Sequence, residues 1–196
     1  TSVTTACSYT PADKGYGIRA AIWAGAHLDA EPAPVLFDRG LVAPGVDAGY
    51  VDSENAFGGK AFPGTVGQYN PGSQPFLKVN RHGERFMNES QEYDNASHAS
   101  FQQPGHVYAM IHDANFREDV DRFHTIGCSA LTRYIPGMME GQLEQYEGEG
   151  LIMKADTIEE LADKMGFTGA DKDNFVATVA RYNELYDKQN DEDFGK

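Results

Sequence analysis

The sequence predicts a single α+β fold, and three observations lead to that prediction. The chain has 196 residues, of which 40% are hydrophobic and 23% are charged, as is usual for a globular domain. Short apolar segments around a glycine turn indicate strands in the middle of the chain. Periodic apolar residues in the last quarter indicate helices. No apolar run approaches the length of about 20 residues that a membrane-spanning helix needs.

The first three quarters of the chain give one helix and then a mixed region. Residues 17–28 (GIRAAIWAGAHL) predict a helix because they are rich in alanine and place apolar residues on one face. Residues 31–72 are rich in Gly and Pro, which predicts loops with short strands. Residues 76–88 predict a β-hairpin that turns at Arg81-His82-Gly83. A strand at 107–111 and a helix at 115–123 follow.

The last quarter predicts two helices. Asp156 with Glu159 fits a capping box that starts the first helix, and Gly166 can end it in the left-handed conformation. The second helix is expected from about residue 172 to 189. Its apolar stripe recurs at spacings of three and four residues: Phe175, Val179, Tyr182 and Tyr186.

Charge and composition exclude several classes of function. The formal net charge is −14 and the basic residues are scattered, so a phosphate backbone would be repelled and nucleic acid is excluded as a partner. The two cysteines, Cys7 and Cys128, are far apart and form neither a disulfide scaffold nor a CxxC pair. The six histidines show no ligand-like spacing, so no metal site is predicted. His112-Asp113 is the best local pairing, and we interpret that histidine as structural.

Gly15, Tyr16 and Gly17 are the candidate cofactor-binding residues. Residues 15–20 (GYGIRA) match the G-x-G-x-x-A form of the dinucleotide fingerprint and precede the first predicted helix. The preceding residues 6–14 are polar and contain a proline, whereas a Rossmann turn follows a buried parallel strand. We therefore interpret these glycines as a turn that allows close backbone approach, not as an independent Rossmann site.

Several segments resemble the flavoproteins of the fumarate reductase and succinate dehydrogenase family. Residues 79–89 (VNRHGERFMNE) are similar to the family segment V-N-x-x-G-x-R-F-x-N-E, and residues 94–97 (DNAS) to its D-x-A-S. The helix at 17–29, the strand at 108–113 and the closing helices, which end in Asp191-Glu192-Asp193-Phe194, resemble family segments in the same order.

The resemblance implies that the chain is a capping-domain segment of a larger flavoprotein. It implies that residues 1–30 are a remnant of the edge of the FAD-binding domain and that residues 31–196 form the substrate-capping domain. In that family FAD passes hydride to an activated C=C bond, so the implied partners are a small unsaturated substrate and the remainder of the flavoprotein. Because cofactors carry the hard chemistry, we expect this segment to be inactive alone and not to retain FAD.

The resemblance also singles out Tyr93 as the candidate catalytic residue. Fumarate reductases have a proton-donating arginine just before D-x-A-S, and Tyr93 stands there in this chain. A tyrosine is a neutral donor that suits a carbonyl or a single oxygen, whereas arginine binds a carboxylate bidentately. Other departures lie at Tyr69 and Gly72, in place of the family's proton relay, and at Phe37-Asp38, in place of its His-Pro element. An enoate or enone other than fumarate is therefore implied.

Two alternatives remain open at this point. One is a ketosteroid dehydrogenase-like flavoenzyme, in which Tyr93 would polarise an enone. The other is a free-standing binding or interaction domain without redox chemistry, which would use the Gly- and Pro-rich segment 31–72. Tyr93 as an ordinary packed residue is an equally good interpretation.

Overall fold

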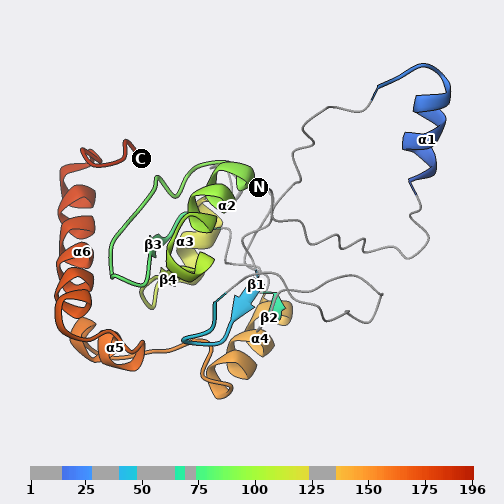
Figure 1. The fold of residues 1–196 in the computed structure, drawn as a ribbon. Coiled ribbons are helices and arrows are strands. Elements are labelled where there is room, and N and C mark those ends of the chain that lie inside the picture. The colour runs from blue at the N-terminus through green and yellow to red at the C-terminus, as the bar shows by residue number, and fades with distance from the viewer. Residues whose placement is uncertain (1–14, 28–39, 48–64, 69–73, 124–135) are drawn as a thin grey trace.

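The computed structural model describes residues 15–27, 40–47, 65–68, 74–123 and 136–196. Within these ranges the chain is mixed helix and strand, which confirms the predicted α+β class (Figure 1). None of the helices in the described ranges is long and apolar enough to cross a bilayer. The elements in chain order are α1 (Tyr16–Trp23), β1 (Gly40–Val42), β2 (Thr65–Gln68), β3 (Leu77–Val79), α2 (Tyr93–Phe101), the 3₁₀ turn η2 (Pro104–His106), β4 (Ala109–Ile111), α3 (Phe116–Phe123), α4 (Pro136–Gly148), α5 (Ile158–Lys164) and α6 (Gly169–Lys188).

Two small antiparallel sheets are described. β3 pairs with β4 in the register Leu77↔Ile111, Lys78↔Met110 and Val79↔Ala109. β1 pairs with β2, and the register shifts between Leu41 and Val42. The hairpin predicted for residues 76–88 is therefore wrong in its second strand, because β3 takes β4 as its partner and leaves only an isolated bridge from Val79 to Arg85.

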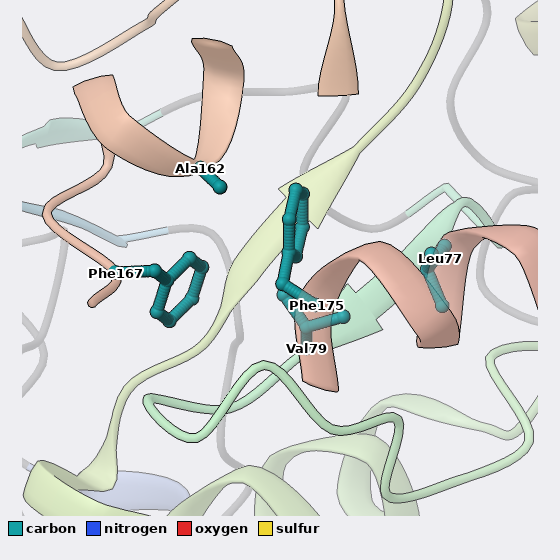
Figure 2. Packing of buried hydrophobic residues seen from close by; sticks show 5 residues of the cluster. All are labelled: Leu77, Val79, Ala162, Phe167 and Phe175. Atoms are coloured by element: carbon teal, nitrogen blue, oxygen red, sulfur yellow. The ribbon is translucent and has the colours of Figure 1, made fainter. Parts of the chain in front are cut away.

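The β3–β4 sheet packs on both faces because its side chains alternate. Leu77 and Val79 point to a cluster with α5 and α6, whose buried members are Ala162, Phe167 and Phe175 (Figure 2). The rings of Phe167 and Phe175 stack with their centroids 5.2 Å apart. On the opposite face a second cluster is formed by Phe76, Phe116 and Val120, with Met110, Phe123 and Leu143 packed against it. The core is thus a helix, sheet and helix arrangement.

Helix α5 starts and ends through local signals. Its N-cap is Thr157, whose Oγ1 accepts a hydrogen bond from the Glu160 backbone N–H at 3.1 Å. The side chain of Glu160 in turn accepts from the Asp156 N–H at 3.3 Å. The N-cap is therefore Thr157 and not Asp156, and Glu160 bonds the N–H of the residue before the cap. Gly166 follows α5 with a φ of +83°, as predicted.

Helix α6 starts three residues earlier than predicted and differs from the prediction in its stripe. Phe175 is buried, and Val179 and Tyr182 pack against the same cluster. Tyr186 is 67% exposed, and Leu185 is buried at that end of the helix instead. On an ideal 3.6-residue repeat Tyr186 lies nearer the line of Phe175 than Leu185 does. The burial of Leu185 therefore reflects what α6 contacts at that end and not the repeat itself.

Candidate functional site

The segment between β3 and α2 forms a tight turn that rests on α6. The side-chain Oδ1 of Asn80 accepts backbone N–H bonds from His82 at 2.9 Å and from Glu84 at 3.1 Å. Gly83 has a φ of +72°. A Cβ added there would lie 2.5 Å from the Asp171 carbonyl oxygen and 2.6 Å from the Phe175 nitrogen. Only glycine therefore permits this approach of the turn to α6.

Arg85 follows this turn and is the centre of a buried ion network. Its Nε and Nη2 donate to the Glu89 carboxylate at 2.8 and 2.9 Å. Its Nη1 and Nη2 donate to the Asp191 carboxylate at 3.1 and 2.7 Å. The side chains of Arg85, Glu89 and Asp191 are 6%, 0% and 7% exposed. Two bidentate contacts of this kind are strong, charge-assisted hydrogen bonds.

Aromatic rings cover the guanidinium group of Arg85. The Arg85 Cζ lies 5.0 Å from the centroid of the Tyr182 ring and 4.8 Å from that of the Phe194 ring. Hydrogen bonds from Arg85 hold the pKa of the Asp191 carboxyl well below its usual range, although burial opposes that shift. Burial and the nearby Glu89 carboxylate raise the pKa of the Tyr182 hydroxyl.

Two lysines add positive charge beside the same network. The Lys196 ammonium lies 3.4 Å from the Glu89 Oε2 and also donates to the Pro75 carbonyl and the Tyr182 hydroxyl. Burial lowers the pKa of Lys196. Lys78 is almost fully buried, and its Nζ donates to the Gln74 carbonyl at 2.8 Å. The two carboxylates of the network thus balance several cations in a poorly solvated site.

Helix α2 begins four residues after Glu89 and carries the predicted catalytic position. The Asn88 side chain accepts the Ser90 N–H at 2.9 Å and donates to the Phe194 carbonyl at 3.4 Å. Glu92 is the N-cap, and Tyr93 is the first residue of α2. The side chain of Tyr93 lies outside the described residues. The backbone of Tyr93 follows the segment 85–92, which the ion pair of Arg85 with Glu89 holds in place.

The predicted cofactor-binding residues lie at the start of α1. Gly15 is the N-cap with a φ of +67°, and no side chain caps the helix. No described atom lies within 4 Å of a Cβ built on Gly15 or on Gly17. Tyr16 is 67% exposed, and the Arg19 guanidinium lies over its ring at 5.7 Å from the centroid. Among the described residues, the backbone at this helix N-terminus is therefore open to close approach by another group.

The structure does not bring the two predicted sites together. Figure 1 shows α1 well separated from α2, at whose start Tyr93 lies. Helix α1 has no buried residue. Its exposed apolar side chains are Tyr16, Ile18, Ile22 and Trp23.

Of the other positions that the sequence singled out, several are not described and His112 is. Tyr69, Gly72, Phe37, Asp38 and both cysteines lie outside the described residues. The ring of His112 packs between those of Phe76 and Phe116, at 5.3 and 4.5 Å between centroids. Its Nδ1 lies 3.2 Å from the Asp113 carbonyl oxygen. His112 has the surroundings of a structural histidine. In the part of the chain that the structure describes, no three His, Cys, Asp or Glu residues are grouped as a metal site.

Sequence reasoning missed the pairing of Arg85 with Asp191. The two residues lie 106 positions apart, and no periodicity connects them. The only available signal was that both lie in segments that resemble the same family, Arg85 in residues 79–89 and Asp191 in the closing segment. Resemblance marked each segment but did not show that they are in contact.

Comparison with known proteins agrees with the resemblance. A family model described as "FAD binding domain" matches residues 1–195. The chain is 33% identical over 121 residues to an NADH:acrylate oxidoreductase of Vibrio harveyi, covering 62% of the chain and 10% of that protein. It is 36% identical over 137 residues to a 3-oxosteroid 1-dehydrogenase of Mycolicibacterium smegmatis, covering 64% of the chain and 21% of that protein.

A third relative is an NADH:fumarate oxidoreductase of Klebsiella pneumoniae, which is 29% identical over 120 residues. The match covers 61% of the chain and 10% of that protein. The chain therefore spans between about a tenth and about a fifth of the length of these three relatives.

Proposed function

We propose, since this chain belongs to the FAD binding domain family of flavoprotein oxidoreductases, that it is the substrate-capping segment of a flavoenzyme that reduces an activated C=C bond. The observation that carries the proposal is the family match over residues 1–195 together with relatives named for acrylate, fumarate and 3-oxosteroids. Acrylate and fumarate carry a C=C bond next to a carboxyl group. In a 3-oxosteroid such a bond can be introduced next to the carbonyl group.

The proposed division of the chain places residues 1–30 at the edge of the FAD-binding domain and residues 31–196 in the cap. The open backbone at Gly15 and Gly17 supports an FAD contact there, because no described side chain fills the space. The exposed apolar side chains of α1 support packing of this helix against another part of the flavoprotein.

When bound and reduced, FAD would supply hydride to one carbon of the double bond. Tyr93 would then donate its phenolic proton to the neighbouring carbon, so that one hydride and one proton saturate the bond. Its position at the first residue of α2, four residues after the buried and ion-paired Glu89, supports a fixed donor. A neutral phenol donates one hydrogen bond or proton. It therefore suits an enone, or an enoate that presents one of its oxygens near the reacting carbon.

The test uses the full-length flavoprotein that contains this chain. Purified protein should show flavin absorbance that dithionite bleaches, and it should reduce at least one member of a panel of acrylate, fumarate and an enone steroid. Tyr93→Phe should lower kcat on that substrate by about 100- to 10,000-fold, the range of a lost general acid. A Tyr93→Phe variant with the full rate would remove the proton-donor role.

A second candidate is dehydrogenation of a 3-oxosteroid, favoured by the relative from Mycolicibacterium smegmatis, which is 36% identical. In that reaction Tyr93 would donate a hydrogen bond to the ketone and polarise it. Product analysis separates the two reactions, since one saturates a double bond and the other introduces one. A full-length protein that binds no flavin would instead favour a binding domain without redox chemistry.

A further inference from the structure

We propose that Asp191 is a positioning residue, which holds Arg85 against Glu89 and so fixes the start of α2 where Tyr93 lies. The inference rests on the proposed role of Tyr93 in the reaction. It concerns a residue in the loop after α6 that sequence reasoning gave no role of its own.

The guanidinium group of Arg85 sets the geometry of the ion network. A guanidinium has five N–H donors in a rigid plane. Arg85 uses four of them, two toward Glu89 and two toward Asp191. The planar fork therefore fixes the orientation of both carboxylates at once. The rings of Tyr182 and Phe194 lie over the guanidinium, as described above, and restrict its movement further.

Asp191 is itself held firmly. Its Oδ1 accepts the backbone N–H groups of Asp193 and Phe194, both at 3.1 Å. Its Oδ2 accepts the N–H of Lys196 at 3.0 Å. The loop after α6 thus folds around this carboxylate, and α6 in turn packs on the β3–β4 sheet through Phe175. Asp191 is a rigid support and not a mobile surface group.

Glu89 is joined to the start of α2 by a short turn. Only residues 90–92 separate Glu89 from Tyr93, and the Asn88 side chain closes this short turn through the Ser90 N–H. The first backbone hydrogen bond of α2 runs from the Ala96 N–H to the Glu92 carbonyl at 3.0 Å. A displacement of the Glu89 carboxylate would therefore pass directly to the backbone of Tyr93.

The positioning role of Asp191 is separate from the overall stability of the fold. The core around Leu77, Val79 and Phe175 is formed without Asp191. Asp191→Asn keeps the shape of the side chain but removes its charge and places an N–H group near the Arg85 donors. The expected effect is a loosened start of α2 on an otherwise intact core.

The experiment compares four forms of the full-length flavoprotein: wild type, Asp191→Asn, Tyr93→Phe and the double variant. Asp191→Asn should speed hydrogen exchange of the amides at 96–98 by about 10-fold or more while the β3 amides keep their protection. Its kcat should fall by about 10- to 100-fold, with KM changed by less than about twofold. In the Tyr93→Phe background the same substitution should have no further effect on kcat.

Asp193→Asn is the matched control. Asp193 lies in the same loop but pairs with Arg181 at the surface, with both side chains 35% exposed. Its kcat should stay within about twofold of wild type, as for a surface ion pair. If Asp191→Asn does not fold, Asp191→Glu replaces it, because it keeps the charge but moves the carboxylate by one methylene.

Unchanged exchange at 96–98, an unchanged kcat, or the same loss of kcat with and without the Tyr93 hydroxyl would each overturn the positioning role. Failure of the proposed function would appear separately, as a Tyr93→Phe variant with the full rate. In that case the hydrogen-exchange rates at 96–98 in Asp191→Asn would still show whether Asp191 fixes the start of α2.

Discussion

At the scale of single residues, two glycines with the same backbone conformation show how tertiary contact sets the cost of a side chain. Gly83 and Gly150 both have a φ of +72°. A Cβ on Gly83 would meet the backbone of α6, whereas no described atom lies within 4 Å of a Cβ on Gly150. The left-handed conformation alone costs a non-glycine residue about 1 kcal/mol.

We expect Gly83→Ala to lower the free energy of unfolding by about 2–4 kcal/mol, because the overpacking against α6 adds to the left-handed strain. Gly150→Ala is the control, with an expected loss of about 1 kcal/mol. Urea unfolding of the two variants measures the difference. Equal losses would show that the turn can move away from α6 at little cost.

His112 predicts a dependence of stability on pH. Burial between aromatic rings lowers its pKa, against a smaller opposing effect of the Asp113 carbonyl. The unfolded chain, with an ordinary histidine pKa of about 6.5, therefore binds more protons than the folded chain below that pH. The stabilising contribution of neutral His112 is complete above pH 6.5 and is lost as the pH falls toward the folded pKa.

The expected result is a lower urea midpoint at pH 5.5 than at pH 7.5, with a smaller difference in His112→Phe, which keeps the aromatic contacts but does not titrate. Asp191 does not contribute in this range, because its lowered pKa places its own loss of stability below pH 4. An unchanged pH difference in His112→Phe would assign the effect to other groups.

At the scale of elements, the two closing helices begin with the same residue type in different roles. Thr157 caps α5 through a side-chain hydrogen bond, whereas Thr168 is the N-cap of α6 without one. The backbone dihedrals are similar at both caps, with φ of −130° and −140°. The difference therefore lies in the side-chain contact alone.

Thr157→Ala should lower the free energy of unfolding by about 1 kcal/mol, the usual cost of a lost N-cap bond. Thr168→Ala should cost less, because no cap bond is removed. The midpoints of urea unfolding give both values. A larger loss for Thr168→Ala would contradict the assignment of the caps.

At the scale of the whole molecule, α1 is the element that the rest of the described chain does not cover. Trp23 is the single tryptophan of the sequence and is 78% exposed. Its ring and that of Tyr16 flank Arg19, whose guanidinium lies 5.4 and 5.7 Å from their centroids. Such exposure of apolar side chains on one helix is typical of a surface that contacts another part of a protein.

Under the proposed division of the chain, Trp23 should be buried in the full-length flavoprotein. Its fluorescence should then be less accessible to acrylamide quenching, and lie at shorter wavelength, than in the 196-residue chain alone. Excitation at the indole band keeps the contribution of tyrosine small. The emission of Trp23→Phe is subtracted as the background, which leaves the signal of Trp23. Equal quenching in both proteins would place α1 at a free surface.

The local features of this protein could be predicted from its amino-acid sequence. Apolar periodicity predicted α3, α5 and α6, Gly166 predicted the end of α5, and the segment at 79–89 indicated the family that the comparisons show. These features depend on residues a few positions apart, where helix geometry and turn chemistry act.

Contacts between segments far apart in the chain became known from the three-dimensional structure. It paired β3 with β4 instead of with residues 84–88, buried Leu185 in place of Tyr186, and joined Arg85 to Asp191. These outcomes depend on which surfaces pack together, and no local pattern records that choice. The physical reason is that burial and ion pairing act between atoms in space, whereas periodicity acts only along the chain.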